Sequence, residues 1–430
     1  MAFTIEQRIG KYVYVYEATS YWDKDKKQPR QKRKLLGRRD TITGKLIKTD
    51  RKRKNTIIKI QDYGNVYFLN NLWEKTKLEK IIKDVYPNNY NSIKGLVNYV
   101  ISENKPFYLY SFWADYNFSI NQESNLSSQR ISDLLNSIGD RSNTQEKFFK
   151  LWIQSQKETE GFYFDITSLS TYSKELTLAE WGYNRDKEKL RQINLGITYG
   201  IRSQLPLYYK LYQGSISDVS TLKNIVKYNK QCGLKGMTYI LDRGFFSKSN
   251  LEGLGNEKVI IPMTFSSKES QEILTANSKK LLNRRELFDY KGHLYYYAEG
   301  EKEIRGKRYK YHIFREKERY DEQETVFLKQ LMAIEKAIIK SEHISEDDVK
   351  EHIENLSGGY SKYFSINKIE NGYYVAEQNI EEIEKRINRF GTFILLTNLK
   401  NVVKEEVLKY YKQRDRVEKI FSLSNKYFDK

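Results

Sequence analysis

Hydrophobic and polar residues alternate along the first part of the chain, which is typical of β-strands with one buried face. The stretch VYVYEATSYW (13–22) alternates over its length, and DYGNVYF (62–68) has the pattern of a turn followed by a strand. The basic segments KDKKQPRQKRKLLGRRD (24–40) and KTDRKRK (48–54) are expected to be loops or strand ends. A solvated connection and a phosphate-contacting arm both remain open for these segments. Residues 1–70 are therefore predicted to form a β-rich basic region.

Residues 71–160 show the three- and four-residue spacing of apolar side chains that predicts amphipathic helices. The clearest segments are LWEKTKLEKIIKDVY (72–86), SIKGLVNYVIS (92–102) and SSQRISDLLNSI (127–138). Short helices beside basic residues can form a DNA-binding module, or they can form a plain bundle that packs on a core. No residue that reads bases can be named in this region.

The pattern changes at residue 161 to apolar strands that are followed by alternating helices and strands. In chain order, the predicted elements are the strands GFYFDITSLS (161–170), RQINLGITYGI (191–201) and LPLYYKLYQG (205–214), the helix DVSTLKNIVKYNKQCG (218–233), the strand MTYILD (237–242), the helix SKSNLEGLG (247–255) and the strand KVIIPM (258–263). This order is that of a ribonuclease-H-like core, in which three antiparallel strands precede a helical crossover.

A different pattern interrupts this core between residues 266 and 390. It contains a hairpin signature (290–316), in which two alternating runs flank a charged turn, and a long amphipathic helix (325–340). The apolar strand FGTFILLTN follows, and EEVLKYYKQRDRVEKIFSLSNKYF (405–428) is predicted to be one helix. The expected fold class is α/β with a β-rich and helical insertion in the core. The expected parts are 1–70, the β-rich region; 71–160, the helical region; 161–265, the first part of the core; 266–390, the inserted subdomain; and 391–430, the last core strand and helix.

The charge balance narrows the classes of partner. The 430 residues carry a formal net charge of +19, which favours a polyanion such as nucleic acid, although a basic surface can also serve solubility or ribosome association. The single Cys232 excludes an internal disulfide, and four His residues leave carboxylates as the expected metal ligands. No apolar run reaches the length of about 18 residues that a membrane helix needs, and the start lacks a secretory-signal layout. A cytoplasmic protein is expected.

Asp242 ends an apolar strand, where a carboxylate is costly unless something binds it. Asp165 lies in the first core strand, which neighbours the Asp242 strand in a ribonuclease-H-like core. Two carboxylates at that distance repel unless a divalent cation lies between them. Glu418 is a candidate third acid, and spacings of three and four residues place Tyr411, Arg414 and Glu418 on one face of the predicted helix. Each acid also has an ordinary interpretation: a turn residue, a helix cap or a surface acid. Together they predict metal-dependent chemistry at phosphodiesters.

Three stretches carry a resemblance to a known family: FYFDITSLS (162–170), YILDRGFFS (239–247) and YKQRDRVEKIF (411–421). The chain resembles bacterial insertion-sequence transposases with an Asp-Asp-Glu triad, of the insertion-sequence-four superfamily and its branch sixteen-thirty-four. A β-rich insertion before the Glu is a trait of that group. The resemblance implies a DNA transposase that cuts the terminal inverted repeats of its element and joins them to target DNA, as a homodimer on DNA.

The same resemblance assigns roles to individual residues. The implied metal ligands and catalytic acids, for Mg²⁺ or Mn²⁺, are Asp165, Asp242 and Glu418. The implied DNA-contacting residues are Arg243, Tyr411, Arg414 and Lys426. Two departures from the family pattern stand out. Asn425 occupies the usual Lys position, with Lys426 next to it, and the chain ends at Lys430, where relatives continue with further helices. A C-terminally truncated transposase is therefore expected. The alternatives are a metal-dependent nuclease without strand transfer and a remnant that only binds DNA.

Overall fold

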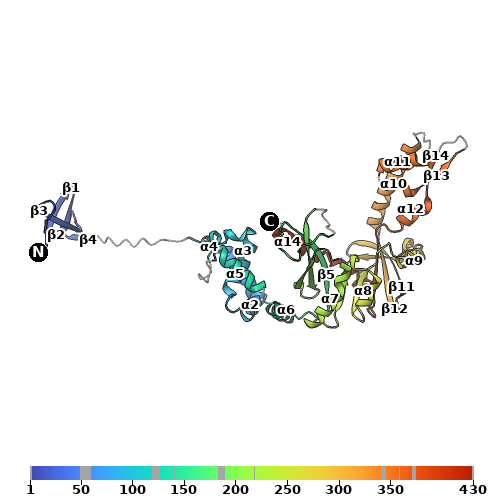
Figure 1. Cartoon of the computed structure of the whole chain (residues 1–430), viewed down its shortest axis with the longest axis horizontal. Helices are drawn as coiled ribbons and strands as arrows, with labels where there is room; N and C mark the ends of the chain where they lie inside the picture. The colour runs from blue at the N-terminus through green and yellow to red at the C-terminus, as the bar shows by residue number, and fades with distance from the viewer. Residues whose placement is uncertain are drawn as a thin grey trace. The chain divides into compact units, whose positions relative to one another are not determined.

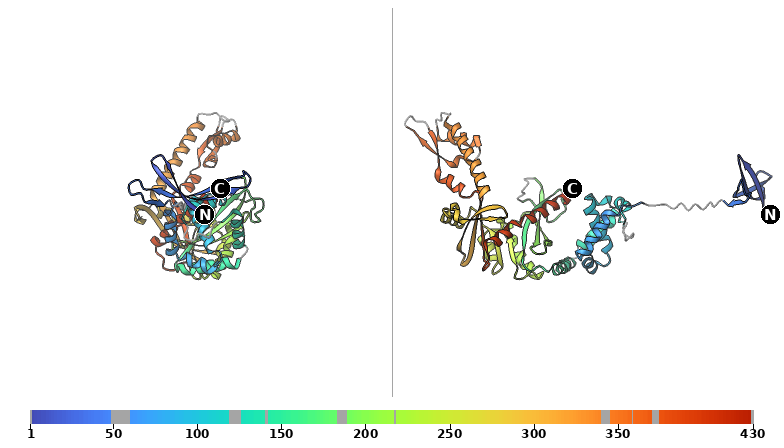
Figure 2. Two further views of the ribbon diagram at one scale, coloured as in Figure 1. Left: turned by 90° about the vertical axis from the view of Figure 1, so that its left-hand side faces the viewer. Right: turned by 180° about the vertical axis from the view of Figure 1, so that it is seen from behind.

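The computed structural model divides the chain into two compact units, Met1–Asp62 and Tyr63–Lys430 (Figures 1 and 2). The residues that the structure describes are 2–48, 60–118, 126–139, 142–182, 189–216, 218–339, 345–357, 359–369 and 374–428. Among these residues, every helix is too short or too polar to span a bilayer.

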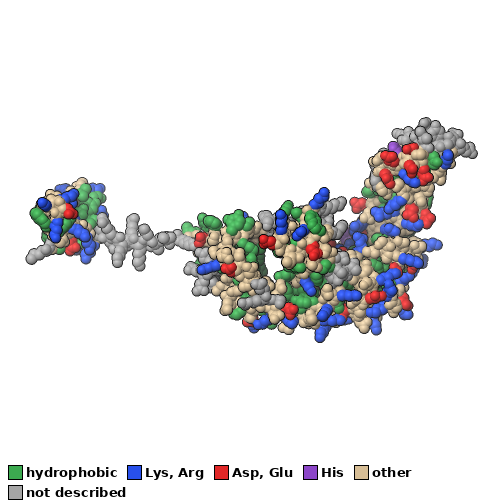
Figure 3. All heavy atoms as spheres, in the orientation of Figure 1, with side chains coloured by type: hydrophobic (Ala, Val, Ile, Leu, Met, Phe, Trp, Pro, Cys, Tyr) green, Lys and Arg blue, Asp and Glu red, His purple; other side chains and the backbone are tan. Residues whose placement is uncertain are grey.

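The first unit is an antiparallel sheet of four strands in the order β1-β2-β3-β4. The strands are β1 (Ala2–Ile9), β2 (Tyr12–Asp23), β3 (Gln28–Arg39) and β4 (Leu46–Lys48). Val15 and Ala18 are buried in it, and Lys and Arg side chains surround hydrophobic ones on its visible face (Figure 3). The β-rich content expected here is confirmed for residues 2–48.

The predictions for the basic segments 24–40 and 48–54 have different outcomes. Most of the segment 24–40 is a strand rather than a loop, because β3 pairs with β2 from Gln28 to Arg38 with one irregularity in register. The ladder with β2 satisfies the backbone hydrogen bonds along one edge of this polar strand, which its side-chain pattern alone does not reveal. The segment 48–54 lies outside the described residues except for Lys48.

The second unit begins with a group of helices, as the apolar spacing predicts. They are α1 (Gly64–Lys75), α2 (Leu78–Val85), α3 (Tyr90–Glu103), the 3-10 turn η1 (Phe107–Leu109), α4 (Tyr110–Tyr116), α5 (Ser128–Gly139) and α6 (Ser142–Gln156). The strand predicted within 62–68 is wrong, since these residues begin α1. The buried residues of α1 are Val66, Leu69 and Trp73, whose spacing of three and four marks one helical face.

A sheet of nine strands forms the centre of the second unit, so the chain is a mixed α/β protein with a large mixed sheet. Its first elements are β5 (Gly161–Thr171), β6 (Arg191–Gly200), β7 (Pro206–Gln213), α7 (Asp218–Gln231), β8 (Thr238–Leu241), the 3-10 turn η2 (Arg243–Phe245), α8 (Lys248–Gly253) and β9 (Lys258–Pro262). Their spatial order is β7-β6-β5-β8-β9, with β6 antiparallel to β5 and β7, and β8 parallel to β5 and β9. The predicted order of strands and helices is confirmed for this part of the chain.

The strands of the predicted hairpin extend this sheet. The elements after β9 are α9 (Lys268–Asn277), the 3-10 turns η3 (Lys280–Leu282) and η4 (Arg284–Glu286), and the strands β10 (Leu287–Tyr290), β11 (His293–Ile304) and β12 (Lys307–Glu316). β12 pairs with β15 (Thr392–Thr397), and β15 pairs with β9. The hairpin therefore belongs to the central sheet, because β15 connects it to the core strands.

Residues 317–390 form a group of elements with its own hydrophobic core. They include α10 (Lys317–Ile339), α11 (Glu346–Ser357), the 3-10 turn η5 (Ser361–Tyr363), the paired strands β13 (Phe364–Lys368) and β14 (Tyr374–Gln378), and α12 (Ile380–Ile387). Phe327, Leu331, Ile353 and Ile383 are buried together in this core. The wider boundary of the insertion, 266–390, stays a prediction.

Helices cover both faces of the central sheet. Alternation along β5 sends Phe162 and Phe164 into a core that α7 and α8 share, while Tyr163 points to the opposite face. The opposite face is covered by α13 (Lys404–Lys412) and α14 (Asp415–Phe428), and α14 lies beside β5 (Figure 2). Burial of Val417 against this face contributes about 1.5–3 kcal/mol.

The single helix predicted for 405–428 is wrong, because the chain breaks at Gln413 and Arg414 into α13 and α14. At the break the backbone N–H of Arg414 bonds to Tyr411 and that of Val417 bonds to Arg414, three residues back rather than four. The hydroxyl of Tyr163 also donates to Oε1 of Gln413 at 3.2 Å, which ties the break to strand β5. Arg414 thus lies between the two helices.

Candidate active site

Asp165 and Asp242 occupy neighbouring positions on two parallel strands. Phe164 of β5 is paired with Leu241 of β8, and each aspartate is the next residue of its strand or strand extension. Asp242 keeps an extended backbone, with φ −77° and ψ 161°, before the turn η2. Adjacent strands lie about 4.8 Å apart, so the two aspartates lie next to each other, as the sequence predicts.

Both carboxylates lie on the face of the sheet that α13 and α14 cover. Alternation places Asp165 on the same side as Tyr163 and Asp242 on the same side as Ile240, and these two neighbours are buried with residues of α13 and α14. The backbone N–H of Ile166 donates to Oδ1 of Asp165 at 2.9 Å. The backbone N–H of Gly244 lies 3.4 Å from Oδ2 of Asp242.

Arg414 connects Asp242 to Glu418. Its Nη1 forms an ion pair with Oδ1 of Asp242, and its Nη2 donates to Oε1 of Glu418 at 2.9 Å. The Arg414 side chain is 16% exposed, whereas those of Asp242 and Glu418 are 36% and 49% exposed. The break before α14 therefore brings the third predicted acid to the end of strand β8 through one guanidinium group.

Tyr411 forms part of the wall of this site. Its ring stacks on Phe393 with centroids 4.8 Å apart, and the guanidinium of Arg414 lies 5.7 Å from its ring centroid. Burial raises the pKa of Tyr411, and the charges of Arg243, Lys412 and Arg319 oppose that rise. These three cations therefore act electrostatically on the tyrosine. Arg243 and Arg414 were predicted to lie at the site.

Arg319, at the start of α10, was missed by the sequence analysis. It is separated from Tyr411 by most of residues 317–390, and no local spacing links the two. Lys426 belongs to α14, but its side chain lies outside the described residues.

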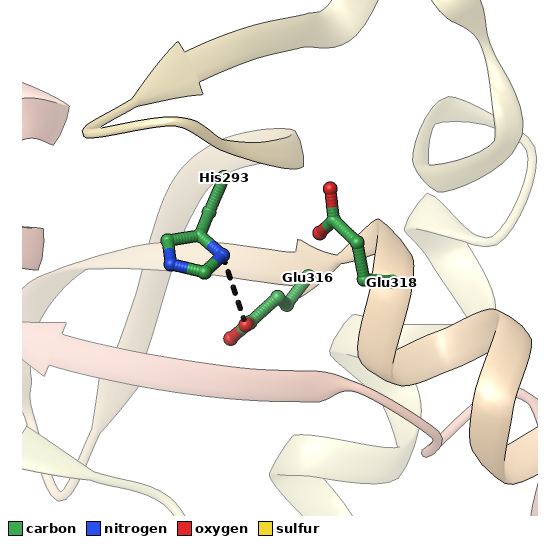
Figure 4. A group of neighbouring side chains, drawn as sticks. All are labelled: His293, Glu316 and Glu318. Carbon is green, nitrogen blue, oxygen red and sulfur yellow. Dashed lines mark ion pairs between the residues drawn. The ribbon is translucent and has the colours of Figure 1, made fainter.

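A second group of potential metal ligands lies at the β11–β12 end of the sheet. One ligand atom each from His293, Glu316 and Glu318 lies within 4.8 Å of the others (Figure 4). In the described part of the chain, it is this group, and not the three predicted acids, whose ligand atoms come this close. The sequence predicts carboxylates as metal ligands, and this group was missed because its members come from the ends of two paired strands and a following helix.

Neighbouring groups already engage Glu316. Its Oε2 accepts from Nζ of Lys412 at 3.1 Å and from the hydroxyl of Tyr295 at 3.2 Å, while Oε1 lies 3.8 Å from Nδ1 of His293. Burial raises the pKa of Glu316, but the contacts with Lys412 and Tyr295 outweigh it and hold the pKa below its usual value. The carboxylate is therefore ionised and largely neutralised by Lys412, which lowers its value as a ligand.

Comparison with known proteins gives one match that covers most of the second unit. The family model described as transposase DDE domain matches residues 156–429. No curated protein matches the chain.

Two solved structures are similar at low scores. A piggyBac transposase synaptic complex with hairpin DNA has 11% identity and a TM-score of 0.33, covering 84% of this chain and 58% of that one. Endonuclease V of Ciona intestinalis, in complex with a 24mer DNA, has 12% identity and a TM-score of 0.19, covering 37% and 77%. The chain thus spans little more than half of the piggyBac chain.

Proposed function

Because the chain belongs to the family of transposase DDE domains, we propose that it is a DNA transposase that cleaves phosphodiester bonds at the ends of an insertion sequence and joins them to target DNA. The proposed catalytic acids are Asp165, Asp242 and Glu418. The observation that carries this proposal is the placement of Asp165 and Asp242 on adjacent parallel strands, with Glu418 linked to Asp242 through Arg414.

The proposed acids fit a divalent cation. They offer oxygen atoms only, the donor type that Mg²⁺ and Mn²⁺ prefer, and Asp242 and Glu418 are partly open to solvent. Adjacent carboxylates repel each other unless a positive charge lies among them, and Arg414 provides one here. Such ions, when bound, activate the attacking oxygen and stabilise the leaving one.

The cations around Tyr411 are suited to hold DNA phosphates. Arginine forks bind phosphate oxygens in pairs, and the charges of Arg243 and Arg319 act on the tyrosine at the edge of the proposed site, whereas Lys412 pairs with Glu316. We assign Arg243, Arg414 and Tyr411 to phosphate contact and orientation, and Lys426 to a further contact along α14. In this proposal Arg414 would give up its contacts with Asp242 and Glu418 to a bound divalent cation and would then be free to contact the DNA backbone.

The finer features follow from the resemblance. They are a ribonuclease-H-like catalytic core, for which the order β7-β6-β5-β8-β9 is the supporting observation, a bacterial insertion sequence of the insertion-sequence-four superfamily, terminal inverted repeats as the bound ends, a homodimer on DNA, and a cytoplasmic site of action.

A nicking assay tests the proposal. The substrate is a supercoiled plasmid that carries the gene with several hundred base pairs of its native flanking DNA, incubated with the protein and Mg²⁺ or Mn²⁺. We expect wild-type protein to cut at fixed positions near the ends, and Asp165→Asn and Asp242→Asn proteins to lose at least about 100-fold in rate.

The control is Glu301→Gln, which removes an exposed carboxylate of β11. It should cut like the wild type. Cutting that survives both aspartate substitutions would remove the proposed site. Cutting without any joined product would indicate a nuclease instead of a transposase.

A further inference from the structure

Strands β2 and β3 project as a two-stranded ribbon from the first unit. We define the basic ribbon as residues 19–34, in which the antiparallel pairs run from Thr19 with Lys32 to Asp23 with Gln28. Each of these residues is exposed except Asp23, which is half-buried. In β1, Ala2 pairs with Thr19 and is the first residue of that strand, while β4 pairs only with residues 37–39 of β3. In the described sheet the ribbon therefore has no further strand along either edge beyond Thr19, and its side chains are exposed on both faces.

The basic ribbon concentrates positive charge. It contains seven cationic side chains against two acids, a formal charge of +5. The cations are Lys24, Lys26, Lys27, Arg30, Lys32, Arg33 and Lys34. Asp23 is occupied at the turn, where it accepts from the backbone N–H groups of Asp25 and Lys26 at 3.1 Å and pairs with Arg30 at 3.3 Å. Asp25 is the second acid of the ribbon, and Glu17, just outside it, lies opposite Lys34. The seven cations themselves are exposed to solvent.

The pairing register sorts these side chains onto two faces. Arg30 and Lys32 lie opposite Tyr21 and Thr19, and Lys34 follows on the same face. Successive side chains of one face are about 6.7 Å apart, so the three cations form a row. Arg33 lies on the other face, with Trp22. Tyr21 is 50% exposed and Trp22 is 62% exposed.

A solvent-exposed ribbon of this kind has a marginal structure unless it has a partner. Two strands without a hydrophobic face are stabilised weakly, and two large exposed aromatic side chains add an unfavourable hydration term. Among polyanions, duplex DNA fits best, because its major groove admits a two-stranded β-ribbon. The deep, narrow major groove of duplex RNA does not admit side chains in this way.

We propose that the basic ribbon binds duplex DNA by insertion into the major groove, with the face that carries Tyr21, Arg30, Lys32 and Lys34 toward the DNA and the face that carries Trp22 and Arg33 turned away from it. The choice of DNA as ligand rests on the proposed function. The ribbon belongs to a different unit of the chain from the acids proposed for catalysis, so its binding requires neither metal nor Asp242.

The test is fluorescence anisotropy of the full chain with a labelled mixed-sequence duplex of 30 base pairs, in EDTA, over a range of salt concentrations. The variant replaces Arg30, Lys32 and Lys34 by Gln. We expect binding at least tenfold weaker, and a slope of log affinity against log salt that is smaller by about 2–3, since each phosphate contact contributes about 0.9.

The matched control replaces Arg8, Lys45 and Lys48 by Gln, three exposed cations of the same unit outside the ribbon. It removes the same charge and should change affinity less than threefold. Equal weakening by both triple variants would show that only net charge acts and would overturn the proposal. Circular dichroism of each variant checks that the strands remain.

Two further duplexes test the groove. Glucosylated 5-hydroxymethylcytosine, which fills the major groove, should abolish the difference between wild type and the ribbon variant, whereas distamycin in the minor groove should leave it. A duplex RNA of the same sequence that competes as well as the DNA would also contradict the proposal. If DNA binding passes these tests and plasmid nicking fails, the ribbon proposal stands and only the catalytic proposal is rejected. If nicking succeeds and DNA binding fails these tests, only the ribbon proposal is rejected.

Discussion

Arg414, at the break between α13 and α14, forms an ion pair with Asp242 at the end of strand β8. The same guanidinium reaches Glu418 one turn later in the chain. One cation therefore neutralises two of the three proposed metal ligands, at a place where a divalent cation would compete for the same oxygens. Metal binding and the Arg414 contacts are mutually exclusive in this account.

Removal of Arg414 should consequently strengthen metal binding. Without DNA, we expect Arg414→Gln to bind Mn²⁺ about 3- to 10-fold more tightly than the wild type, as measured by electron paramagnetic resonance of free Mn²⁺. Nicking should nevertheless fall, because the phosphate contact is lost. The control Arg416→Gln removes a neighbouring cation of α14. Unchanged or weaker Mn²⁺ binding by Arg414→Gln would contradict the competition.

Loss of an aspartate carboxylate should abolish nicking without unfolding the protein. Asp242→Asn loses an ion pair between partly exposed groups, which contributes about 1 kcal/mol or less to stability. We expect urea denaturation of Asp242→Asn to give a free energy of unfolding within that range of the wild type, alongside a loss of nicking. A loss of several kcal/mol would mean that the aspartate has a structural role instead.

Arg319 should act on DNA and not on metal. It is exposed at the start of α10, and its charge acts on Tyr411. We expect Arg319→Gln to weaken binding of a duplex end about 3- to 10-fold while Mn²⁺ affinity stays the same. Arg308→Gln, a substitution of an exposed arginine of β12, serves as the control. Equal weakening of DNA binding by the two substitutions would show that the location of Arg319 does not matter for DNA binding.

His312 should make the protein sensitive to acid. It is fully buried in β12, with Nδ1 2.7 Å from the hydroxyl of Tyr297, and burial lowers its pKa from 6.5 to about 4. The unfolded chain therefore binds a proton below pH 6.5 that the folded chain refuses until about pH 4. Stability from this group is complete above pH 6.5 and is lost as the pH falls, by about 3 kcal/mol in all.

The substitution His312→Gln should remove this loss. Urea denaturation between pH 7 and pH 4 should show a flatter stability profile for His312→Gln than for the wild type. His293→Gln, which changes an exposed histidine, should keep the wild-type slope. A parallel profile for His312→Gln and the wild type would show that another group carries the acid sensitivity.

The core elements could be predicted because their patterns are local. Each strand from β5 to β9 shows its own apolar run, and the order of these runs with two helices limits the topology. The adjacency of Asp165 and Asp242 follows from that topology. Phe164 and Leu241 are paired on two parallel strands, and each aspartate is the next residue of its chain segment. No pairing information was needed beyond the order of elements.

Features that depend on distant pairing could not be predicted. In the described sheet the hairpin β11–β12 joins the core strands through β15, about 80 residues later, and the charge of Arg319 acts on Tyr411 across a similar span of sequence. Short segments failed for another reason. The four apolar residues in 62–68 fit both periods. The helix break at Gln413 coincides with a contact to Tyr163 that no helical spacing reveals.

The location of the bound metal tests the central claim most directly. Fe²⁺ in place of Mg²⁺, with ascorbate and peroxide, generates hydroxyl radicals that cut the chain beside the ion, and mass spectrometry identifies the fragments. The account predicts cuts next to Asp165, Asp242 and Glu418 that excess Mg²⁺ suppresses and that Asp242→Asn lacks. Cuts confined to the neighbourhood of His293 and Glu316 would place the metal in the other group of ligands and contradict the account.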